Sequence, residues 1–211
     1  MKTPLILIGG GGHCKSCIDV IECNGSFEIK GILDKKERMG EKVFDYIILA
    51  DDDEIPAFVS KGYAFHISSG QIKTAKLRSQ IFDLVKASGG ILPVIFAPTS
   101  HQSKHAQIGE GTILMHNTIV NASAIIGANC IINNGALIEH DTTVGDSTHV
   151  STMAVVNGDS HIGSKCFIGS NSVVNHGVTI TDNVIIGSGS VVRHNIVEPG
   201  IYAGNLLKRI A

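Results

Sequence analysis

Residues 126–144, IGANCIINNGALIEHDTTV, carry an aliphatic side chain at every sixth position: Ile126, Ile132, Ile138 and Val144. The same spacing continues on both sides of this stretch, from Ile108 to Val192, without an exception. The residue two positions before each aliphatic is small or medium-sized. Three positions after it, most repeats carry Gly, Asn, Asp or Ser, which tolerate the positive φ of a tight corner. The pattern predicts a hexapeptide repeat, in which each unit is a short strand followed by a corner.

A longer period indicates how the repeats close. Glycines recur eighteen residues apart, at Gly109, Gly127, Gly145 and Gly163. Three hexads therefore make one triangular coil, and successive coils stack at about 4.8 Å. Each coil buries its aliphatic residues only by stacking on its neighbours, as in other repeat proteins. The second half of the chain is predicted to be a parallel β-helix.

The first half opens with a strand, a glycine loop and a helix. Pro4 to Gly9 is an apolar run, four glycines precede His13, and a helical pattern continues through Glu22. A second strand, Phe27 to Leu33, ends at Asp34. This layout places backbone N–H groups against a phosphate and a carboxylate near a ribose hydroxyl. Because Cys14 replaces the third glycine of the dinucleotide fingerprint, a mononucleotide or nucleotide sugar fits better. The alternative is a loop that only turns the chain.

Further strands are predicted at Asp45–Leu49, Tyr63–Ser68 and Ile91–Phe96, with an amphipathic helix at Gln71–Ala87. That helix would bury the face made of Leu77, Ile81, Phe82 and Val85. Alternating strands and helices indicate a parallel sheet, and hence a small α/β, Rossmann-like domain. We expect two domains: residues 1–97, which bind the nucleotide sugar, and residues 98–211, which form the β-helix and transfer the acyl group.

Composition limits the classes of binding partner and the cellular compartment that we expect for the protein. The net charge is −2 without a long run of like charges, so neither nucleic acid nor an anionic membrane is expected as partner. No apolar stretch is long enough to span a membrane. Five cysteines, three at positions 14, 17 and 23 and two in the small-residue column at 130 and 166, indicate reduced core residues in a cytoplasmic protein. The Cys14-x-x-Cys17 pair could instead serve redox chemistry or half a zinc site.

Histidines in the repeat permit two kinds of chemistry. His140, His176 and His194 share one column of the β-helix, which could suggest a zinc site like that of β-helical γ-type carbonic anhydrases. However, His140 and His176 lie two coils apart, about 9.6 Å, which is too far for both to bind one ion within one chain. Metal binding is therefore the weaker hypothesis.

Acyl transfer is the stronger one. His140 lies between Glu139 and Asp141, and either carboxylate could orient its imidazole and stabilise the protonated form. Gly158, one coil further along, leaves space beside His140 and offers an N–H to an oxyanion. The alternative is that His140 is a solvated corner residue.

Four motifs carry a resemblance that covers both halves: Leu5–His13, Gly31–Asp34, Ile138–Asp141 and Gly145–Ser151. With them, the chain resembles the hexapeptide-repeat acyltransferases grouped with sialic acid O-acetyltransferases. It is most similar to bacterial nucleotide-sugar N-acetyltransferases. The resemblance implies a left-handed β-helix, which departs from the usual right-handed crossover, and a homotrimer. It also implies acetyl-CoA as co-substrate between adjacent prisms, with no metal.

The resemblance also assigns residues. It implies His140 as general base with a carboxylate partner, Asp141 or Glu139. The nucleotide sugar would contact Gly11, Gly12, His13, Asp34, Lys35 and Asn133, and acetyl-CoA would contact His149, Gly158, Gly187 and Lys208. Near the C-terminus, the family's G-x-P-A-K is replaced by Gly204-Asn205-Leu206-Leu207-Lys208, without the proline.

The expected reaction is direct transfer of acetyl from acetyl-CoA to the 4-amino group of a UDP- or dTDP-linked deoxyamino sugar. Three alternatives remain open: O-acetylation of sialic acid or another sugar, a zinc enzyme of the carbonic anhydrase type, and a non-catalytic repeat scaffold.

Overall fold

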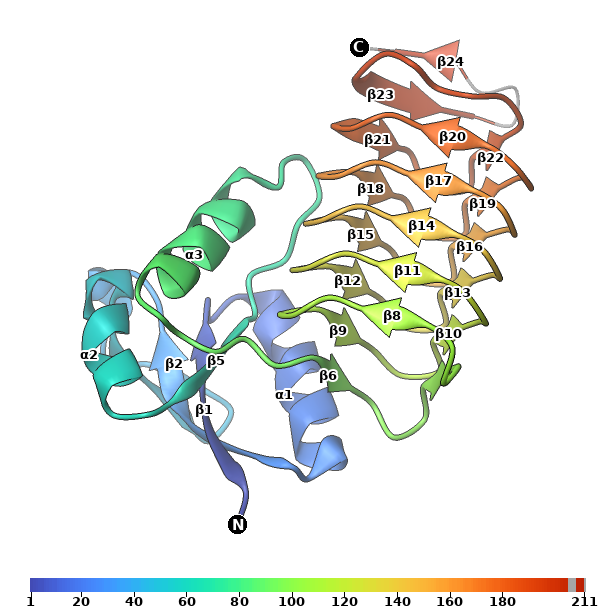
Figure 1. The fold of residues 1–211 in the computed structure, drawn as a ribbon. Coiled ribbons are helices and arrows are strands. Elements are labelled where there is room, and N and C mark those ends of the chain that lie inside the picture. The colour runs from blue at the N-terminus through green and yellow to red at the C-terminus, as the bar shows by residue number, and fades with distance from the viewer. Residues whose placement is uncertain (205–207, 211) are drawn as a thin grey trace. The chain divides into compact units, whose positions relative to one another are not determined.

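The computed structural model describes residues 1–204 and 208–210, which form two compact units (Figure 1). The first unit contains Met1–Gly70 and Lys76–Pro98, and the second contains Gln71–Ala75 and Thr99–Ala211. The division into functional domains at residue 97 stays a prediction. What the sequence did not indicate is that the short segment Gln71–Ala75 groups with the second unit.

A five-stranded sheet in the order β3-β4-β2-β1-β5 forms the centre of the first unit. The strands are β1 (Thr3–Ile8), β2 (Phe27–Leu33), β3 (Lys42–Val43), β4 (Tyr46–Ala50) and β5 (Ala64–Ile67). All are parallel except β3, which pairs antiparallel with β4. Strand β1, which lies between β2 and β5, is buried from Leu5 to Ile8 because its neighbours and the helices cover it. This sheet confirms the predicted Rossmann-like fold.

Helices α1 (Gly12–Asn24) and α2 (Ile55–Ser60) connect strands of this sheet, and α3 (Lys76–Ala87) follows β5. Two short 3-10 helices, Lys36–Arg38 and Asp52–Glu54, follow β2 and β4. Helix α1 ends where Gly25 adopts a left-handed conformation (φ 74°) and its N–H bonds to Ile21 O. The helix buries Cys14 and Cys17, and burial raises the pKa of both thiols. These two cysteines are free core residues, whereas Cys23 is exposed, contrary to its prediction as a core residue.

Two predictions in this half were wrong in extent. The helix expected from Gln71 begins only at Lys76, since the Gln71 side-chain amide donates to Ser147 O (2.8 Å) and Cys166 O (3.2 Å) of the β-helix. Leu77, expected on the buried face, is 58% exposed. The strand expected at Ile91–Phe96 is reduced to β6 (Ile95–Phe96), because Pro93 lacks the N–H that a continuous strand requires.

The second unit is a left-handed parallel β-helix, as predicted (Figure 1). Its two- or three-residue strands stack into three sheets, and each strand pairs with the one eighteen residues away, as Ile119 does with Leu137. The strands are β7 (His101–Gln102), β8 (Gln107–Ile108), β9 (Ile113–Leu114), β10 (Ile119–Val120), β11 (Ile125–Ile126), β12 (Ile131–Ile132), β13 (Leu137–Ile138), β14 (Thr143–Val144), β15 (His149–Val150), β16 (Val155–Val156), β17 (His161–Ile162), β18 (Phe167–Ile168), β19 (Val173–Val174), β20 (Thr179–Ile180), β21 (Val184–Ile186) and β22 (Val191–Val192).

The repeat columns have distinct structural roles. From Leu114 to Val192, every sixth residue is buried in one continuous apolar core. The corner column is left-handed at every sixth residue from Gly111 to Gly189, including Ser147, Met153, Asp159, Lys165 and Asn171. In the glycine column a Cβ on Gly109 would lie 2.5 Å from the carbonyl carbon of Gly127. The eighteen-residue glycine period thus reflects close contact between successive coils.

The last coil is followed by β23 (Gly200–Ala203), which pairs with β21, and by β24 (Lys208–Arg209). The pairing between β23 and β24 is antiparallel, with Tyr202 opposite Arg209. Of the predicted C-terminal segment, residues 205–207 lie outside the described residues. In the part of the chain that the structure describes, no helix has the length and apolar character needed to cross a membrane.

Candidate active site

His140 stands at a corner of the β-helix, two residues after the end of β13. The next residue, Asp141, makes the corner with φ 60°, and this backbone turn brings its carboxylate to the imidazole. His140 Nδ1–H donates to Asp141 Oδ2 at 2.8 Å, which leaves Nε2 as the available base. Both side chains are more than half exposed. A histidine with one nitrogen on a carboxylate and the other open has the arrangement of a general base.

The structure separates the roles of the two neighbouring carboxylates. Glu139 Oε2 accepts a hydrogen bond from Asn121 Nδ2 (2.9 Å) and one from the His140 backbone N–H (3.3 Å). Glu139 therefore bonds to the side-chain amide of the preceding coil and to the main chain, whereas Asp141 bonds to the imidazole ring. Of the two alternatives left open by the sequence, the geometry favours Asp141 as the partner of the ring.

The local charges raise the pKa of His140. The largest cause is the hydrogen bond from the imidazole to Asp141, and the negative charges of Asp141, Glu139 and Asp159 act in the same direction. Desolvation opposes them. The protonated form is stabilised, as a base that must hold a proton during the reaction requires.

Gly158 lies against His140, one coil further along. A Cβ on Gly158 would be 2.8 Å from both Cε1 and Nε2 of the imidazole, so only glycine leaves the ring in this position. At another corner the corresponding backbone N–H does have an acceptor: the Asn134 N–H donates to Asn133 Oδ1 at 2.8 Å. Within the described residues, the Gly158 N–H has no acceptor. A free backbone donor therefore lies next to the open nitrogen of the base.

A groove follows this corner over three coils. It is lined by pairs of residues from successive rungs: Glu139 and His140, Asn157 and Gly158, Asn175 and His176. Asn157 is fixed by a bond from Nδ2 to Val174 O at 2.8 Å. The groove thus presents one imidazole at each end and a glycine between them, with polar side chains along its length.

His149 and Asn133 form a separate cluster on the second unit. His149 is 5% exposed, and its Nδ1–H donates to Gln71 O at 2.6 Å. Its Nε2 then accepts from Asn133 Nδ2 at 3.1 Å, and its ring meets Phe167 edge-on with centroids 5.1 Å apart. The two residues that resemblance assigned to cofactor and sugar are therefore brought together. In the single chain they serve to anchor Gln71, and their contacts with ligands stay predictions.

The other predicted cofactor residues lie near the C-terminal end of the β-helix. Gly187 donates its N–H to Tyr202 O (2.8 Å), and a Cβ there would lie 2.9 Å from the Ala203 Cβ. This close approach of β23 explains the glycine without a ligand. Lys208 is exposed on β24.

The glycine loop of the first unit has the features expected of an anion site. Gly9 is left-handed (φ 101°) and packs against Ser69, so a side chain there would collide with the serine. Gly11 and Gly12, at the start of α1, have open space where a Cβ would point. Helix N-termini carry unsatisfied N–H groups and positive partial charge, which suit a phosphate.

Asp34 supports this loop directly. Its Oδ2 accepts from the Gly10 N–H (2.7 Å) and from Arg38 (2.6 Å), and its Oδ1 accepts from the Lys35 N–H (2.7 Å). Asp34 therefore holds the loop, in addition to any bond that it makes to a ribose. Arg38, which sequence reasoning missed, also reaches Gly10 O at 3.3 Å. Its distance of four residues from a strand-end carboxylate, within one helical turn, was the available signal.

A pocket lies at the carboxyl ends of the parallel strands of this unit. It is lined by Ile8, Gly9, Asp34, Lys35, Asp51, Asp52, Asp53, Ser69, Leu77 and Ile81. Ligands bind at this edge of open α/β sheets as a rule. The sequence had indicated Asp34 and Lys35, but not the three aspartates after β4 or Ser69 after β5. Each of these also follows a strand end, which was the signal that could have found them.

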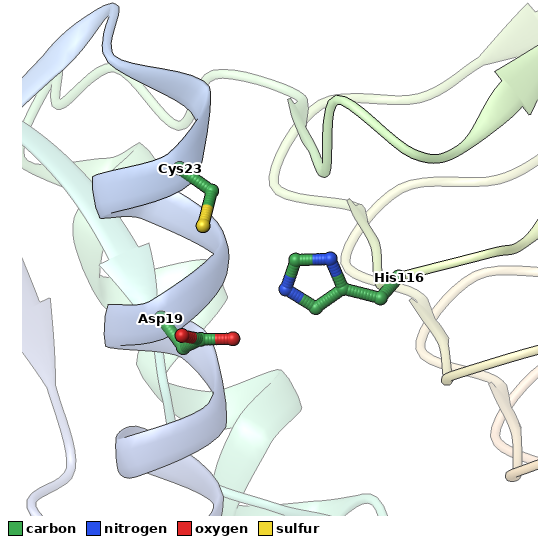
Figure 2. A group of neighbouring side chains, drawn as sticks. All are labelled: Asp19, Cys23 and His116. Atoms are coloured by element: carbon green, nitrogen blue, oxygen red, sulfur yellow. The ribbon is translucent and has the colours of Figure 1, made fainter.

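The metal hypothesis requires several metal-ligand side chains close together within one unit. Asp19 and Cys23 lie one turn apart on the same side of α1 (Figure 2). His116, also labelled there, belongs to the second unit, where its Nδ1 is 3.1 Å from Thr99 Oγ1. Among residues 1–204 and 208–210, neither unit by itself contains three neighbouring metal-ligand side chains.

Together, the hexad coils and the histidine–aspartate corner define a left-handed β-helix protein with a candidate acid–base site beside a free amide. Residues 96–207 match the family described as the GMPPB C-terminal domain, and the chain belongs to this family. Residues 4–85 match the PglD N-terminal domain. No curated protein sequence matches the chain significantly.

Solved structures similar to the chain span its whole length. One is perosamine N-acetyltransferase from Caulobacter crescentus with CoA and GDP-perosamine, in a form with one histidine replaced: TM-score 0.92, 26% identity, covering 99% of this chain and 97% of that one. Another is the acetyltransferase domain of PglB from Neisseria gonorrhoeae FA1090 with acetyl coenzyme A: TM-score 0.92, 26% identity, covering 100% of both chains. WeeI from Acinetobacter baumannii AYE, at 20% identity and TM-score 0.86, shares the fold.

Proposed function

We propose that the protein is an acetyl-CoA-dependent N-acetyltransferase that acts on the amino group of a nucleotide-linked deoxyamino sugar. The structural relatives at 26% identity are acetyltransferases bound to CoA or acetyl-CoA, and one binds a nucleotide-linked amino sugar. The observation that carries the proposal is the His140 corner: an open Nε2, an Asp141 partner and the unpaired Gly158 N–H on the adjacent rung.

The reaction is a direct acyl transfer. The sugar amine attacks the thioester carbon of acetyl-CoA, and His140 Nε2 accepts the proton that the amine loses. Asp141 stabilises the resulting imidazolium. The Gly158 N–H donates to the oxyanion of the tetrahedral intermediate. When the intermediate collapses, the carbon–sulfur bond breaks, and the imidazolium returns its proton to the CoA thiolate. No covalent acyl-enzyme is formed.

The assignment of the remaining residues follows the resemblance. The nucleotide of the substrate lies at Gly11, Gly12, His13, Asp34 and Lys35, and the sugar lies near Asn133. Acetyl-CoA contacts His149, Gly158, Gly187 and Lys208 where adjacent prisms of a homotrimer meet. The open space at Gly11 and Gly12 supports the first part of this assignment. The sugar is 4-amino-substituted, and the resemblance points to UDP or dTDP, whereas the perosamine enzyme binds GDP.

Replacement of His140 tests the mechanism. His140→Ala should lower kcat by a factor of about 10² to 10⁴ and leave the acetyl-CoA dissociation constant nearly unchanged. His161→Ala is a matched control, since His161 is an exposed imidazole of the same β-helix outside the groove, bonded to Thr143 at 2.9 Å. Near-normal turnover by the His140 variant would overturn the assignment of the base.

A substrate panel tests the reaction class. Turnover of acetyl-CoA should be measured with UDP-, dTDP- and GDP-linked 4-amino sugars and with free sialic acid. We expect turnover only with nucleotide-linked amino sugars. Acetylation of sialic acid alone would favour the O-acetyltransferase alternative, which uses the same base and the same oxyanion donor.

A further inference from the structure

The nucleotide pocket of the first unit has an uneven charge distribution. Four of its lining residues are aspartates, at positions 34, 51, 52 and 53, and Lys35 is its one lining cation among the described residues. A diphosphate would be repelled from the aspartates that follow β4. The phosphates therefore belong at the start of α1, where the helix dipole and open space at Gly11 and Gly12 favour them. The acidic part of the pocket then faces the nucleoside.

Apolar side chains provide the surface on which a base can lie. Ile8 and Ile81 line the pocket from the end of β1 and from α3, and both are buried. Leu77 lines it too and is 58% exposed, so its side chain is open to a ligand in the pocket. Flat apolar contact of this kind suits any nucleobase and gives no selectivity among them. Selectivity has to come from the polar groups at the base edge.

Among the three aspartates after β4, only Asp52 has a buried oxygen without a hydrogen-bond partner in the described part of the chain. The Asp51 carboxylate caps the short 3-10 helix by accepting from the Asp53 N–H at 3.2 Å. Asp53 is exposed to solvent. Asp52 is half-buried, and its Oδ1 is buried without a hydrogen-bond partner among the described residues. An unsatisfied buried oxygen is costly, and a ligand that supplies donors removes the cost.

The electrostatics of Asp52 agree with this picture. Burial is the largest cause that raises the pKa of Asp52, and the charges of Asp34, Asp51 and Asp53 add to it. Two donors from a ligand would stabilise the carboxylate form. Rotation about χ2 of an aspartate is soft, so that the carboxylate can turn both oxygens toward a ligand.

We propose that Asp52 selects the nucleobase of the sugar donor, and that the base it selects is guanine. Guanine presents two adjacent donors, N1–H and the 2-amino group, which together match a carboxylate. Uracil and thymine present one N–H between two carbonyl oxygens, and these oxygens are repelled by a carboxylate. The inference rests on the proposed function, since it names the substrate of the same site. It replaces UDP and dTDP by GDP as the expected nucleotide.

Binding to the full-length protein tests the inference. Isothermal titration calorimetry with GDP, IDP, UDP and dTDP should give the tightest binding for GDP. IDP lacks the 2-amino group and should bind about tenfold more weakly. This comparison uses only the wild-type protein, so it does not depend on the folding of a variant. UDP or dTDP binding as tightly as GDP would overturn the inference and leave the proposed function intact.

A substitution at position 52 gives a sharper test. Asp52→Asn replaces one acceptor by a donor, so GDP should bind tenfold or more weakly. The amide matches the N–H and carbonyl of uracil, so UDP binding should be unchanged or stronger. Glu54→Gln, an equal charge change one residue beyond the pocket lining, should alter neither. Equal weakening of all four nucleotides by Asp52→Asn would assign Asp52 a structural role only. If no nucleotide binds the wild-type protein, the proposed function itself fails.

Discussion

Asp141 is hydrogen-bonded to the imidazole of the proposed base, and this gives a pH prediction. The imidazole must be neutral to accept a proton, so activity rises with pH through the pKa of His140. The hydrogen bond to Asp141 is the main cause that raises this pKa. In Asp141→Asn the pKa of His140 should therefore fall, and the acidic limb of the kcat/KM profile should move to lower pH. Turnover at the plateau should fall at least tenfold because the ring loses its orienting partner.

Glu139→Gln is the control for this experiment. Glu139 contributes to the pKa of His140 only through its charge, which ranks below the Asp141 bond among the causes. Its variant should shift the acidic limb in the same direction but by less. A larger shift for Glu139→Gln than for Asp141→Asn would contradict the assignment of Asp141 as the ring's partner.

Gly158 determines where the imidazole can lie. In Gly158→Ala the new Cβ would meet Cε1 and Nε2 at 2.8 Å, and the ring, as the mobile group, has to shift. We expect kcat to fall on the order of 100-fold, as misplacement by about 1 Å can cause. Stability should hardly change. Thermal unfolding and steady-state kinetics of the same preparation measure both effects.

Gly189→Ala is a matched control with the opposite result. Gly189 is left-handed (φ 70°) and has open space around a Cβ. Alanine there should cost roughly 1 kcal/mol of unfolding free energy and leave turnover unaffected. Should Gly158→Ala instead lose stability and keep its turnover, the contact with His140 would have no role in catalysis.

At the level of single residues, the eighteen-residue coil made much of the His140 corner predictable. It converts a difference in residue number into a neighbouring rung, which is how Gly158 was placed beside His140. The repeat could not show whether Glu139 or Asp141 is the carboxylate partner of His140, because both flank the histidine. That choice depends on the left-handed backbone of Asp141 and on the bond from Asn121 to Glu139, which only the folded structure reveals.

At the level of the element, the corners store strain that a substitution can release. Lys165 occupies a left-handed corner (φ 58°) although lysine has no preference for this conformation. Lys165→Gly removes a left-handed cost of roughly 1–2 kcal/mol and adds up to about 1 kcal/mol of chain entropy, so a net gain of up to about 1 kcal/mol is expected. Lys165→Ala retains the Cβ and should give no gain. Chemical denaturation of both variants decides, and equal effects would contradict the strain argument.

Sequence patterns predicted the wrong bounds for a helix whose start is set by contacts with residues far away in the chain. The pattern from Gln71 onward is amphipathic and continuous with α3, so it predicted a longer helix. In the structure, Gln71 is 3% exposed, and its amide and carbonyl bond to Ser147, Cys166 and His149. These partners lie more than 70 residues away in the chain. Local periodicity contains no information on such contacts, whereas it sufficed for the β-helix, whose neighbours recur at a fixed interval.

At the level of the whole molecule, the homotrimer stays a prediction with a direct test. Several outward-facing residues of the β-helix are apolar and exposed, among them Ile119 (41%), Ile125 (46%) and Met153 (56%). Isolated prisms would leave them in water, and assembly would bury them. We expect three copies in sedimentation velocity for the wild-type protein. Ile125→Glu should shift the distribution toward single chains while the circular dichroism stays unchanged. A monomeric wild-type protein would contradict the proposed placement of acetyl-CoA between prisms.

The antiparallel pair of β23 and β24 at the end of the β-helix also affects whether copies of the molecule can stack end to end. A stack of parallel rungs ends in a row of unpaired amides and carbonyls, and such an edge invites growth into a fibre. Here β23 receives β24 in the reverse direction, with Lys208 and Arg209 as its residues. A rung that continued the parallel series would find neither the right chain direction nor a neutral edge. We therefore expect the strand that carries Lys208, the predicted acetyl-CoA contact, also to oppose end-to-end polymerisation.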